Sequence, residues 1–364
     1  MKKFLFQLNH PAHFHLFKNV IHALNKKGHE IKISIKDKDI LKTLVSGYDH
    51  VQISSGYRKK NIISILTSLF DRDRKLYDVV DEFRPDLMIG TSPEIGHVSL
   101  LKKIPALFLG EDDVNLSVPM YLGATISYPF FDKILSPTKV NNSIWNRKTI
   151  FYNGFQKLAY LHPNRFVPDR KKVDVPANRK FFIIRTSSMA AYHDMKMKGI
   201  DNDLCMKLIE TLQPHGEILI SSERKIPPHL SKFKFSGNIE DIHHYLYFAD
   251  LYIGDSQSMA VESAILGTPN IRFNDFAGKI SVLEELENKY QLTIGIQSSD
   301  KDKLFRSIDE ILQVDDVKQV WRKRRSVMLK EKIDVAAFFI WFIENYPQSY
   351  KVLSKNPEYQ NRFK

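Results

Sequence analysis

The stretch YFADLYIGDSQSMAVESAILGTPNIRF, residues 247–273, carries the strongest structural signal in the chain. The run DLYIG, residues 250–254, predicts a buried strand because of its apolar centre, and the turn that follows it leads into a helix. That helix is expected to end at Gly267, because glycine readily adopts the left-handed conformation that terminates helices. Pro269 then begins a second strand. A strand, a helix and a strand in this order predict a parallel βαβ unit.

The turn at 254–258 is the expected ligand-binding element of this unit. Ligands of open parallel sheets bind outside the carboxyl ends of the strands, and the N–H groups at a helix start favour phosphate. Ser256 and Ser258 can cap the helix or donate to phosphate oxygens. Glu262 lies one turn further on the same face, where its carboxylate can accept hydrogen bonds from ribose hydroxyls. Two ordinary N-caps and a surface glutamate are the alternative, and both interpretations stay open.

The same alternation of strands and helices extends outward in two series. In the first series, strands are expected at 4–8, 31–35, 86–90, 105–110 and 133–137, and helices at 14–24, closed by Gly28, and at 61–83. After a loop rich in proline and charge at 162–179, strands are expected at 180–185, 217–221, 250–255 and 269–273, and helices at 202–212, 239–249 and 257–266. The predicted fold class is α/β, with two doubly wound Rossmann-like domains facing each other across a cleft.

The expected domain boundaries follow from these two series. Residues 1–163 form the first domain and residues 164–345 the second, which the helical stretch 301–345 is expected to close. Residues 346–364 form a tail that is expected to pack back on the first domain. At 364 residues the chain exceeds the usual size of a single hydrophobic core, which also favours two domains.

Composition indicates the compartment and the class of partner. The single cysteine, Cys205, fits a reducing compartment, and no signal peptide or membrane-spanning run is found, so a cytoplasmic location is expected. The formal net charge is +12, with its densest cluster at 322–325 beside Trp321. Nucleic acid is not predicted as a partner, because no recognition motif accompanies the charge. Docking to the anionic inner face of a membrane and a merely solvated helix face both stay open.

The stretch NHPAHFH, residues 9–15, follows the first expected strand and allows three interpretations. A metal site is not predicted, because Pro11 disfavours a regular helical pair of His10 and His13 and no cysteine is near. A turn whose imidazoles cap the next helix is the second interpretation. Catalysis is the third, since histidine can take a proton from a hydroxyl group near neutral pH. His13 is the preferred base and His10 its substitute, whereas His15 is expected to face away.

Acidic residues follow the expected strand 105–110. Glu111 and Asp112, within GEDD, are candidates for binding hydroxyl groups of an acceptor or for acting as an alternative base. The spacing is not that of an Asp-x-Asp metal motif. A solvated acidic loop is the open alternative.

Polar residues also follow the first strands of the second series. Arg185 ends a strand, and its guanidinium matches phosphate oxygens in a bidentate manner, so it can neutralise a diphosphate. His193 and Asp194 lie beyond it and can contact either substrate. Ser222 closes the next strand and is expected to cover a nucleotide base.

Four separated segments carry a resemblance to a known family. The motif at 247–273 resembles the donor-nucleotide motif of GT-B enzymes, the class of glycosyltransferases and UDP-N-acetylglucosamine 2-epimerases. The start LNHPAHFHLFKNVIHALNKKGHEIKIS, residues 8–34, resembles the DUF354 family of predicted GT-B glycosyltransferases. The segments YNGFQKLAYLHPNRFVPD (152–169) and IIRTSSMAAYHD (183–194) also resemble that family. The resemblance covers most of residues 1–275.

This resemblance implies a glycosyltransferase that moves a sugar from a nucleotide diphosphate sugar to a hydroxyl acceptor. By resemblance, the donor is a UDP-sugar, the acceptor a glycan or lipid-linked glycan, and the pathway surface polysaccharide or glycan biosynthesis, with neither metal nor cofactor. The residues expected to bind the donor are Arg185, Ser187, Ser222, Gly254, Asp255, Ser256, Gln257, Ser258, Met259 and Glu262. Gln257 departs from the pattern, because related sequences tend to have glycine there, and its side chain can hold the backbone away from the pyrophosphate.

Two other functions remain open at this stage. A UDP-sugar 2-epimerase shares the fold and the motif at 254–267, but epimerases typically carry an Arg-Pro-Glu-like sequence where this chain has histidines. A non-catalytic protein that binds sugar nucleotides would keep the second domain and would need no base at His13.

Overall fold

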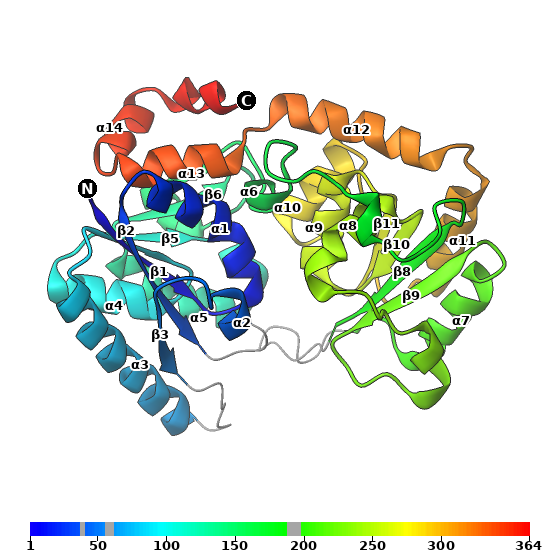
Figure 1. Cartoon of the computed structure of the whole chain (residues 1–364), viewed down its shortest axis with the longest axis horizontal. Coiled ribbons are helices and arrows are strands. Elements are labelled where there is room, and N and C mark those ends of the chain that lie inside the picture. Colours follow the sequence, from blue (N-terminus) through cyan, green and yellow to red (C-terminus); the bar gives the residue numbers. More distant parts are fainter. Residues whose placement is uncertain (37–40, 55–61, 188–197) are drawn as a thin grey trace. The chain divides into compact units, whose positions relative to one another are not determined.

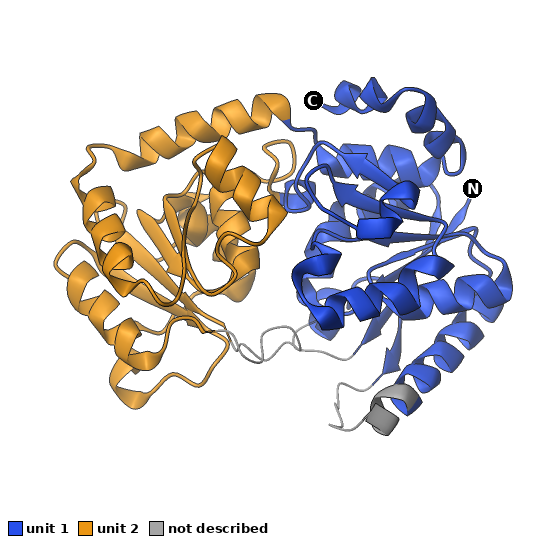
Figure 2. Cartoon of the chain, turned by 180° about the vertical axis from the view of Figure 1, so that it is seen from behind, with its two compact units in different colours: residues 1–160, 332–364 blue, residues 161–331 orange. Residues whose placement is uncertain are grey.

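The computed structural model describes residues 1–36, 41–54, 62–187 and 198–364. The chain divides into two compact units (Figure 2). Unit 1 comprises residues 1–160 and 332–364, and unit 2 comprises residues 161–331. None of the described helices is both long enough and apolar enough to cross a bilayer.

Unit 1 is built on a seven-stranded parallel sheet in the order β3-β2-β1-β4-β5-β6-β7 (Figure 1). Strand β1 is buried from Phe4 to Leu8, as expected for a central strand covered by helices on both faces. The chain moves outward from β1 to β3 and then returns to β4 on the other side of β1. The strands are β1 (Lys3–Leu8), β2 (Glu30–Lys36), β3 (His50–Ser54), β4 (Leu87–Gly90), β5 (Ala106–Leu109), β6 (Lys133–Pro137) and β7 (Thr149–Tyr152).

The helices of unit 1 connect these strands and cover the sheet. Gly28 follows α1 with a positive φ of 82°, which confirms the predicted end of the first helix. The helices are α1 (Pro11–Lys26), α2 (Leu41–Leu44), α3 (Ile62–Phe83), α4 (Pro93–Lys102), α5 (Val118–Ser127), α13 (Val335–Glu344) and α14 (Gln348–Lys355), with α6 (Leu158–Leu161) at the boundary between the units. Short 3₁₀ helices include η1 (Val114–Leu116), η2 (Tyr128–Phe130), η3 (Ser143–Lys148) and η8 (Pro357–Phe363).

Unit 2 contains a five-stranded parallel sheet in the order β12-β11-β10-β8-β9. Its order reverses between β8 and β10. The strands are β8 (Phe181–Thr186), β9 (Glu217–Ser222), β10 (Leu251–Gly254), β11 (Asn270–Phe273) and β12 (Ile294–Ile296). The helices are α7 (Asn202–Leu212), α8 (Ile242–Phe248), α9 (Gln257–Leu266), α10 (Ser281–Glu284), α11 (Lys301–Gln313) and α12 (Val317–Glu331), with η4 (Arg170–Lys172), η5 (Pro228–Phe233), η6 (Ile239–Asp241) and the π-turn η7 (Glu285–Lys289).

The C-terminal region differs from its expected organisation. The stretch 301–345 forms three separate helices, and the last of them, α13, belongs to unit 1. The return to unit 1 therefore begins at Lys332, earlier than the expected tail at 346. The physical reason is the apolar surface of α13, whose Phe339 ring lies 5.2 Å from that of Tyr152 on β7. Glu344 at its end pairs with Lys27 and His29.

The basic cluster at 322–325 has a structural role within unit 2. It lies on α12, where Arg325 donates to the carbonyl of Ile265 at 2.7 Å and Arg324 to that of Gln291 at 2.9 Å. Arg322 lies over the Tyr247 ring. Trp321 is buried. Main-chain and aromatic partners thus hold the three arginines of the cluster against unit 2. Arg322 and Lys323 are nevertheless exposed, so docking to an anionic membrane stays a prediction beside a solvated helix face.

Candidate functional site

The histidine loop lies at the point in unit 1 where the strand order reverses, between β1 and β4. His10 is the N-cap of α1, and its Nδ1 accepts from the Ala12 N–H at 3.2 Å. The capping interpretation therefore holds for His10. His13 lies one turn into the helix, where its Nδ1 accepts from the Asn9 N–H at 3.2 Å and is 3.0 Å from Oγ1 of Thr91, the residue after β4.

This geometry has a consequence for proton transfer at His13. A neutral imidazole whose Nδ1 accepts from Asn9 carries its proton on Nε2. The lone pair that a base needs is therefore engaged by a main-chain N–H, and this bond must be released before the ring can accept a proton there. His15 is oriented differently, with its ring 5.6 Å from that of Tyr160.

Buried polar residues that the sequence did not single out surround this loop. Ser92 donates to Oε1 of Gln7 at 2.7 Å, and both side chains are buried. Glu94, fully buried, pairs with Lys36 at 2.9 Å and with Arg72. Burial alone would raise the pKa of Glu94, but the charges of Lys36 and Arg72 lower it to about 2.

The sequence around Ser92 and Glu94 contains a local indication of a helix start. TSPE, residues 91–94, follows the expected strand 86–90 and has the composition of a helix start, with serine before proline and glutamate in the first turn. Its position after a strand places it at the carboxyl edge of the sheet.

The two candidate carboxylates of the acidic loop after β5, Glu111 and Asp112, differ in their surroundings. Glu111 forms an ion pair with Lys157, whose side chain is buried. Burial and the charge of Glu111 raise the pKa of the neighbouring Tyr152 hydroxyl. Asp112 is exposed. The exposure of Asp112 fits the solvated-loop interpretation, whereas Glu111 is half-buried and held by its ion pair.

In unit 2 the strand order reverses between β8 and β10, and the predicted donor residues Arg185 and Gly254 lie at the carboxyl ends of these two strands. Gly254 pairs in register with Arg185. A Cβ at Gly254 would come within 2.8 Å of the Arg185 Cβ, so only glycine permits this close approach. The Arg185 guanidinium donates to Ser221 at 2.8 Å and pairs with Glu223. An incoming diphosphate would have to compete with Glu223 for this cation.

The Asp255 side chain is held by hydrogen bonds from main-chain N–H groups. Its carboxylate accepts from the N–H of Ser187 at 2.6 Å and from that of Ile200 at 3.2 Å, and Arg224 lies 3.8 Å away. Burial raises its pKa, although these donors oppose the shift. Asp255 thus positions the backbone around the turn, and its predicted contact with a donor nucleotide stays a prediction.

The turn after β10 matches the expected strand-to-helix connection. Ser256 is the N-cap of α9 and accepts from the Met259 N–H at 3.4 Å. Ser258 is exposed at the helix start, Gln257 is half-buried and Met259 is buried. Gly267 has a φ of 75°, which confirms the predicted end of this helix.

Ser222, at the end of β9, is held by local hydrogen bonds. Its hydroxyl accepts from Thr186 at 2.8 Å and donates to the carbonyl of Arg224 at 2.9 Å. His193 and Asp194 lie outside the described residues.

Glu262 has a partner that the sequence did not single out. Its Oε1 lies 3.3 Å from Nε2 of His243 on α8, and both side chains are largely buried. Phe166 packs near this pair, with its ring 6.2 Å from that of His243. In the sequence, the only indication of this partner is the dipeptide His243-His244 within the expected helix 239–249.

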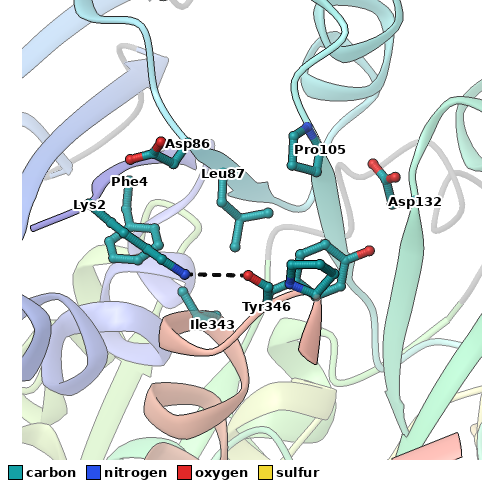
Figure 3. Close-up of a pocket in the computed structure, with 9 residues that line it drawn as sticks. Lys2, Phe4, Asp86, Leu87, Pro105, Asp132, Ile343 and Tyr346 are labelled. Atoms are coloured by element: carbon teal, nitrogen blue, oxygen red, sulfur yellow. Dashed lines mark hydrogen bonds between the residues drawn. The ribbon is translucent and has the colours of Figure 1, made fainter. Parts of the chain in front are cut away.

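A pocket of about 430 Å³ lies at the opposite edge of the unit 1 sheet (Figure 3). It is lined by residues at the amino ends of strands, including Asp86, Asp132 and Lys2, and by the segment after α13. Lys2 donates to the carbonyls of Glu344 and Tyr346, so it fixes the returning C-terminal segment. Ligands of doubly wound sheets bind at the carboxyl ends, and this pocket is therefore not the candidate site. Among the described residues, no group of three His, Cys, Asp or Glu side chains is arranged to hold a metal ion.

Two doubly wound parallel sheets in one chain are the architecture of the GT-B fold. The chain belongs to the DUF354 family, which is described as "Protein of unknown function" and matches residues 3–335. No curated protein sequence matches the chain.

Solved structures with the same fold include both epimerases and glycosyltransferases. MnaA from S. aureus, in a co-structure with UDP, is 12% identical, with 99% of this chain and 97% of that chain covered and a TM-score of 0.65. The UDP-GlcNAc 2-epimerase of Methanocaldococcus jannaschii, in complex with UDP-GlcNAc and UDP, is 14% identical over 86% and 93%, with a TM-score of 0.60. The spinosyn rhamnosyltransferase SpnG, complexed with spinosyn aglycone, is 14% identical over 95% and 100%, with a TM-score of 0.61.

Proposed function

We propose that the protein is a glycosyltransferase. It would transfer a sugar from a nucleotide diphosphate sugar, specifically a UDP-sugar, to a hydroxyl group of a glycan or lipid-linked glycan. Unit 2 would bind the donor and unit 1 would supply the acceptor pocket and the general base. The reaction would belong to cytoplasmic assembly of a surface polysaccharide or another glycan.

The observation that carries the proposal is the pair of histidines at the reversal point of unit 1. His13 lies next to Thr91 at the carboxyl ends of β1 and β4, where an acceptor hydroxyl would be bound. Deprotonation there requires release of the Asn9 bond to the ring, which an acceptor hydroxyl can replace.

In unit 2, the start of α9 and Arg185 support binding of a diphosphate. The N–H groups and positive dipole of the helix would face the phosphates, and Arg185 would stabilise the charge that develops as the diphosphate leaves. The carboxylate of Glu262, oriented by His243, would accept hydrogen bonds from the ribose. No step of this scheme requires a divalent metal.

The rival function is a UDP-sugar 2-epimerase, which is supported by the fold shared with the UDP-GlcNAc 2-epimerase of M. jannaschii. An epimerase would invert C2 of the donor sugar without any acceptor. A non-catalytic sugar-nucleotide-binding protein would bind the same ligands and turn over none of them.

The three functions are separated by one sequence of measurements. A thermal-shift panel of nucleotide diphosphates and their sugars identifies the donor, since a ligand at 100 times its Kd stabilises a fold by roughly 2.7 kcal/mol. That donor is then incubated in D2O with and without candidate glycan acceptors. Acceptor-dependent release of the nucleoside diphosphate is expected. Deuterium at C2 of the donor would instead identify an epimerase, and binding without either change a non-catalytic protein.

A further inference from the structure

Helix α5 of unit 1 presents an apolar face to solvent. Val118, Leu122 and Ile126 recur at the spacing of one helical face and are 72%, 57% and 55% exposed. The opposite side of the helix, around Ala124, is buried and packs with Tyr128 and other residues of a small apolar cluster. The helix is therefore apolar on both sides, although only one side has a core to pack against.

The charge pattern around α5 is equally unusual. No charged residue occurs from 114 to 131, a stretch that includes η1, α5 and η2. Exposed helices of a protein with 26% charged residues ordinarily carry charges on the solvent side.

Helix α4 is in contact with α5 (Figure 1). His97 on α4 lies 3.2 Å from the carbonyl of Ile126, so the two helices meet at this point. Leu101, one turn after His97, is 66% exposed. We name the surface formed by Val118, Leu122, Ile126 and Leu101 the α5 face. Exposed apolar residues that cluster on adjoining elements mark interaction sites.

The net charge of unit 1 indicates the charge of the partner that binds the α5 face. Unit 1 contains 28 lysines and arginines against 18 aspartates and glutamates, whereas unit 2 contains 26 against 24. The net charge of +12 thus divides into +10 for unit 1 and +2 for unit 2. Unit 1, which bears the α5 face, is therefore the electropositive part of the chain.

We infer that the α5 face inserts into the surface of an anionic lipid bilayer. A helix lying in the membrane interface buries its apolar face among the acyl chains, while surrounding positive charge attracts anionic headgroups. Exposed Lys103 and Arg147 lie on segments adjoining α4 and α5 and supply local cations. A second copy of the chain is a less suitable occupant, because two surfaces on units of charge +10 repel each other.

The acidic residues that flank the charge-free stretch refine this inference. Asp112 and Asp132 are exposed and limit the local positive field. Apolar insertion should therefore provide most of the binding, and the net charge of unit 1 should provide the preference for anionic lipid. This inference goes beyond the proposed function and does not depend on it.

Co-sedimentation of the full chain with lipid vesicles tests the inference without any activity measurement. The wild-type protein should pellet with vesicles of phosphatidylcholine and phosphatidylglycerol, and more weakly with phosphatidylcholine alone. The variant Leu122→Ser/Ile126→Ser keeps the charge unchanged, and its binding should fall about tenfold for each apolar side chain removed. The control Val314→Ser/Val327→Ser, at exposed apolar positions of unit 2, should bind like wild type.

Equal melting temperatures of the two double variants would show that their folds are intact. The inference is overturned if wild type pellets with neither type of vesicle, or if the Leu122→Ser/Ile126→Ser variant binds as tightly as wild type. It is also overturned if sedimentation velocity shows a wild-type dimer that this variant dissociates, since the α5 face would then be an interface between two copies.

Discussion

The reversal points of the two sheets contain buried carboxylates whose pKa values shift in opposite directions. In unit 1, Glu94 is paired with Lys36 and Arg72, and its pKa is lowered to about 2. In unit 2, Asp255 bonds mainly to main-chain N–H groups, and burial raises its pKa. The buried carboxylate of unit 1 is thus held by side-chain cations, whereas that of unit 2 is held mainly by main-chain N–H groups. Under the proposed function, proton transfer would take place in unit 1 and diphosphate binding in unit 2.

The largest effect is expected from His13→Ala in unit 1. If His13 is the base, transfer to the acceptor should fall by roughly 10²–10⁴-fold, the usual contribution of a positioned general base. Donor affinity, measured by calorimetry, should stay close to that of wild type, because the donor contacts are proposed in unit 2.

His15→Ala is the matched control, because the His15 ring packs beside that of Tyr160. Its effect on transfer should be mild. A normal transfer rate in His13→Ala would remove His13 as the base and direct attention to Glu111 or Asp112. Parallel loss of activity and stability would favour a purely structural turn.

The second prediction concerns the acid stability that Glu94 confers on unit 1. Because its folded pKa lies below its ordinary 4.5, the ionised carboxylate stabilises the fold above that pH. This contribution, on the order of 3 kcal/mol, should be lost as the pH falls from 4.5 towards 2. Urea unfolding at several pH values should show the loss in wild type and a flatter profile in Glu94→Gln.

Glu82→Gln is the control, because Glu82 is exposed, and it should retain the wild-type profile. An unchanged acid profile in Glu94→Gln would mean that Lys36 and Arg72 do not hold the carboxylate in its ionised form. The electrostatic contrast between the two units would then disappear.

The third prediction tests ribose binding in unit 2. Glu262→Gln should weaken binding of the nucleotide identified by thermal shift by about 10–100-fold, since hydrogen bonds to a charged acceptor contribute roughly 1.5–3 kcal/mol. The same nucleotide lacking the ribose 2′-hydroxyl should bind wild type and variant more equally. Glu210→Gln, at an exposed position of α7, should leave affinity unchanged. Unaltered calorimetric affinity in Glu262→Gln would refute the ribose assignment.

The smallest effect is expected from Ser256→Ala at the start of α9. Loss of the N-cap bond to Met259 should lower the free energy of unfolding by about 1 kcal/mol. If Ser256 is only a cap, the variant should bind the nucleotide with wild-type affinity at a low temperature, at which it is fully folded. A loss of affinity beyond the stability effect would show that its hydroxyl also contacts phosphate.

Local sequence was sufficient for most of the architecture. The strand 133–137 and the helices 202–212 and 257–266 have the predicted bounds, because apolar periodicity, N-caps and terminal glycines act within a few residues. The short strands β3, β7 and β12 were not predicted. Each lies at or next to the end of its sheet order, and pairing with a neighbour strand gives them their strand conformation.

At the candidate sites, too, local sequence predicted the position of the segments but not the contacts of their residues. Placing the histidine loop and the turn at 254–258 after strands required only the strand–helix order, and both segments lie at the reversal points of their sheets. The partners of these residues did not follow from it: Glu94 for Lys36, Glu223 for Arg185 and His243 for Glu262.

The sequence by itself determined the alternating α/β order, the helix ends and the location of the polar turns, since each depends on residues close together in the chain. Only the tertiary structure decided that α13 returns to unit 1, where Lys2 meets the carbonyl of Glu344 across 342 positions of sequence. The physical reason is that such contacts depend on which surfaces remain apolar or charged after the local elements have formed. Local periodicity contains no information about their pairing.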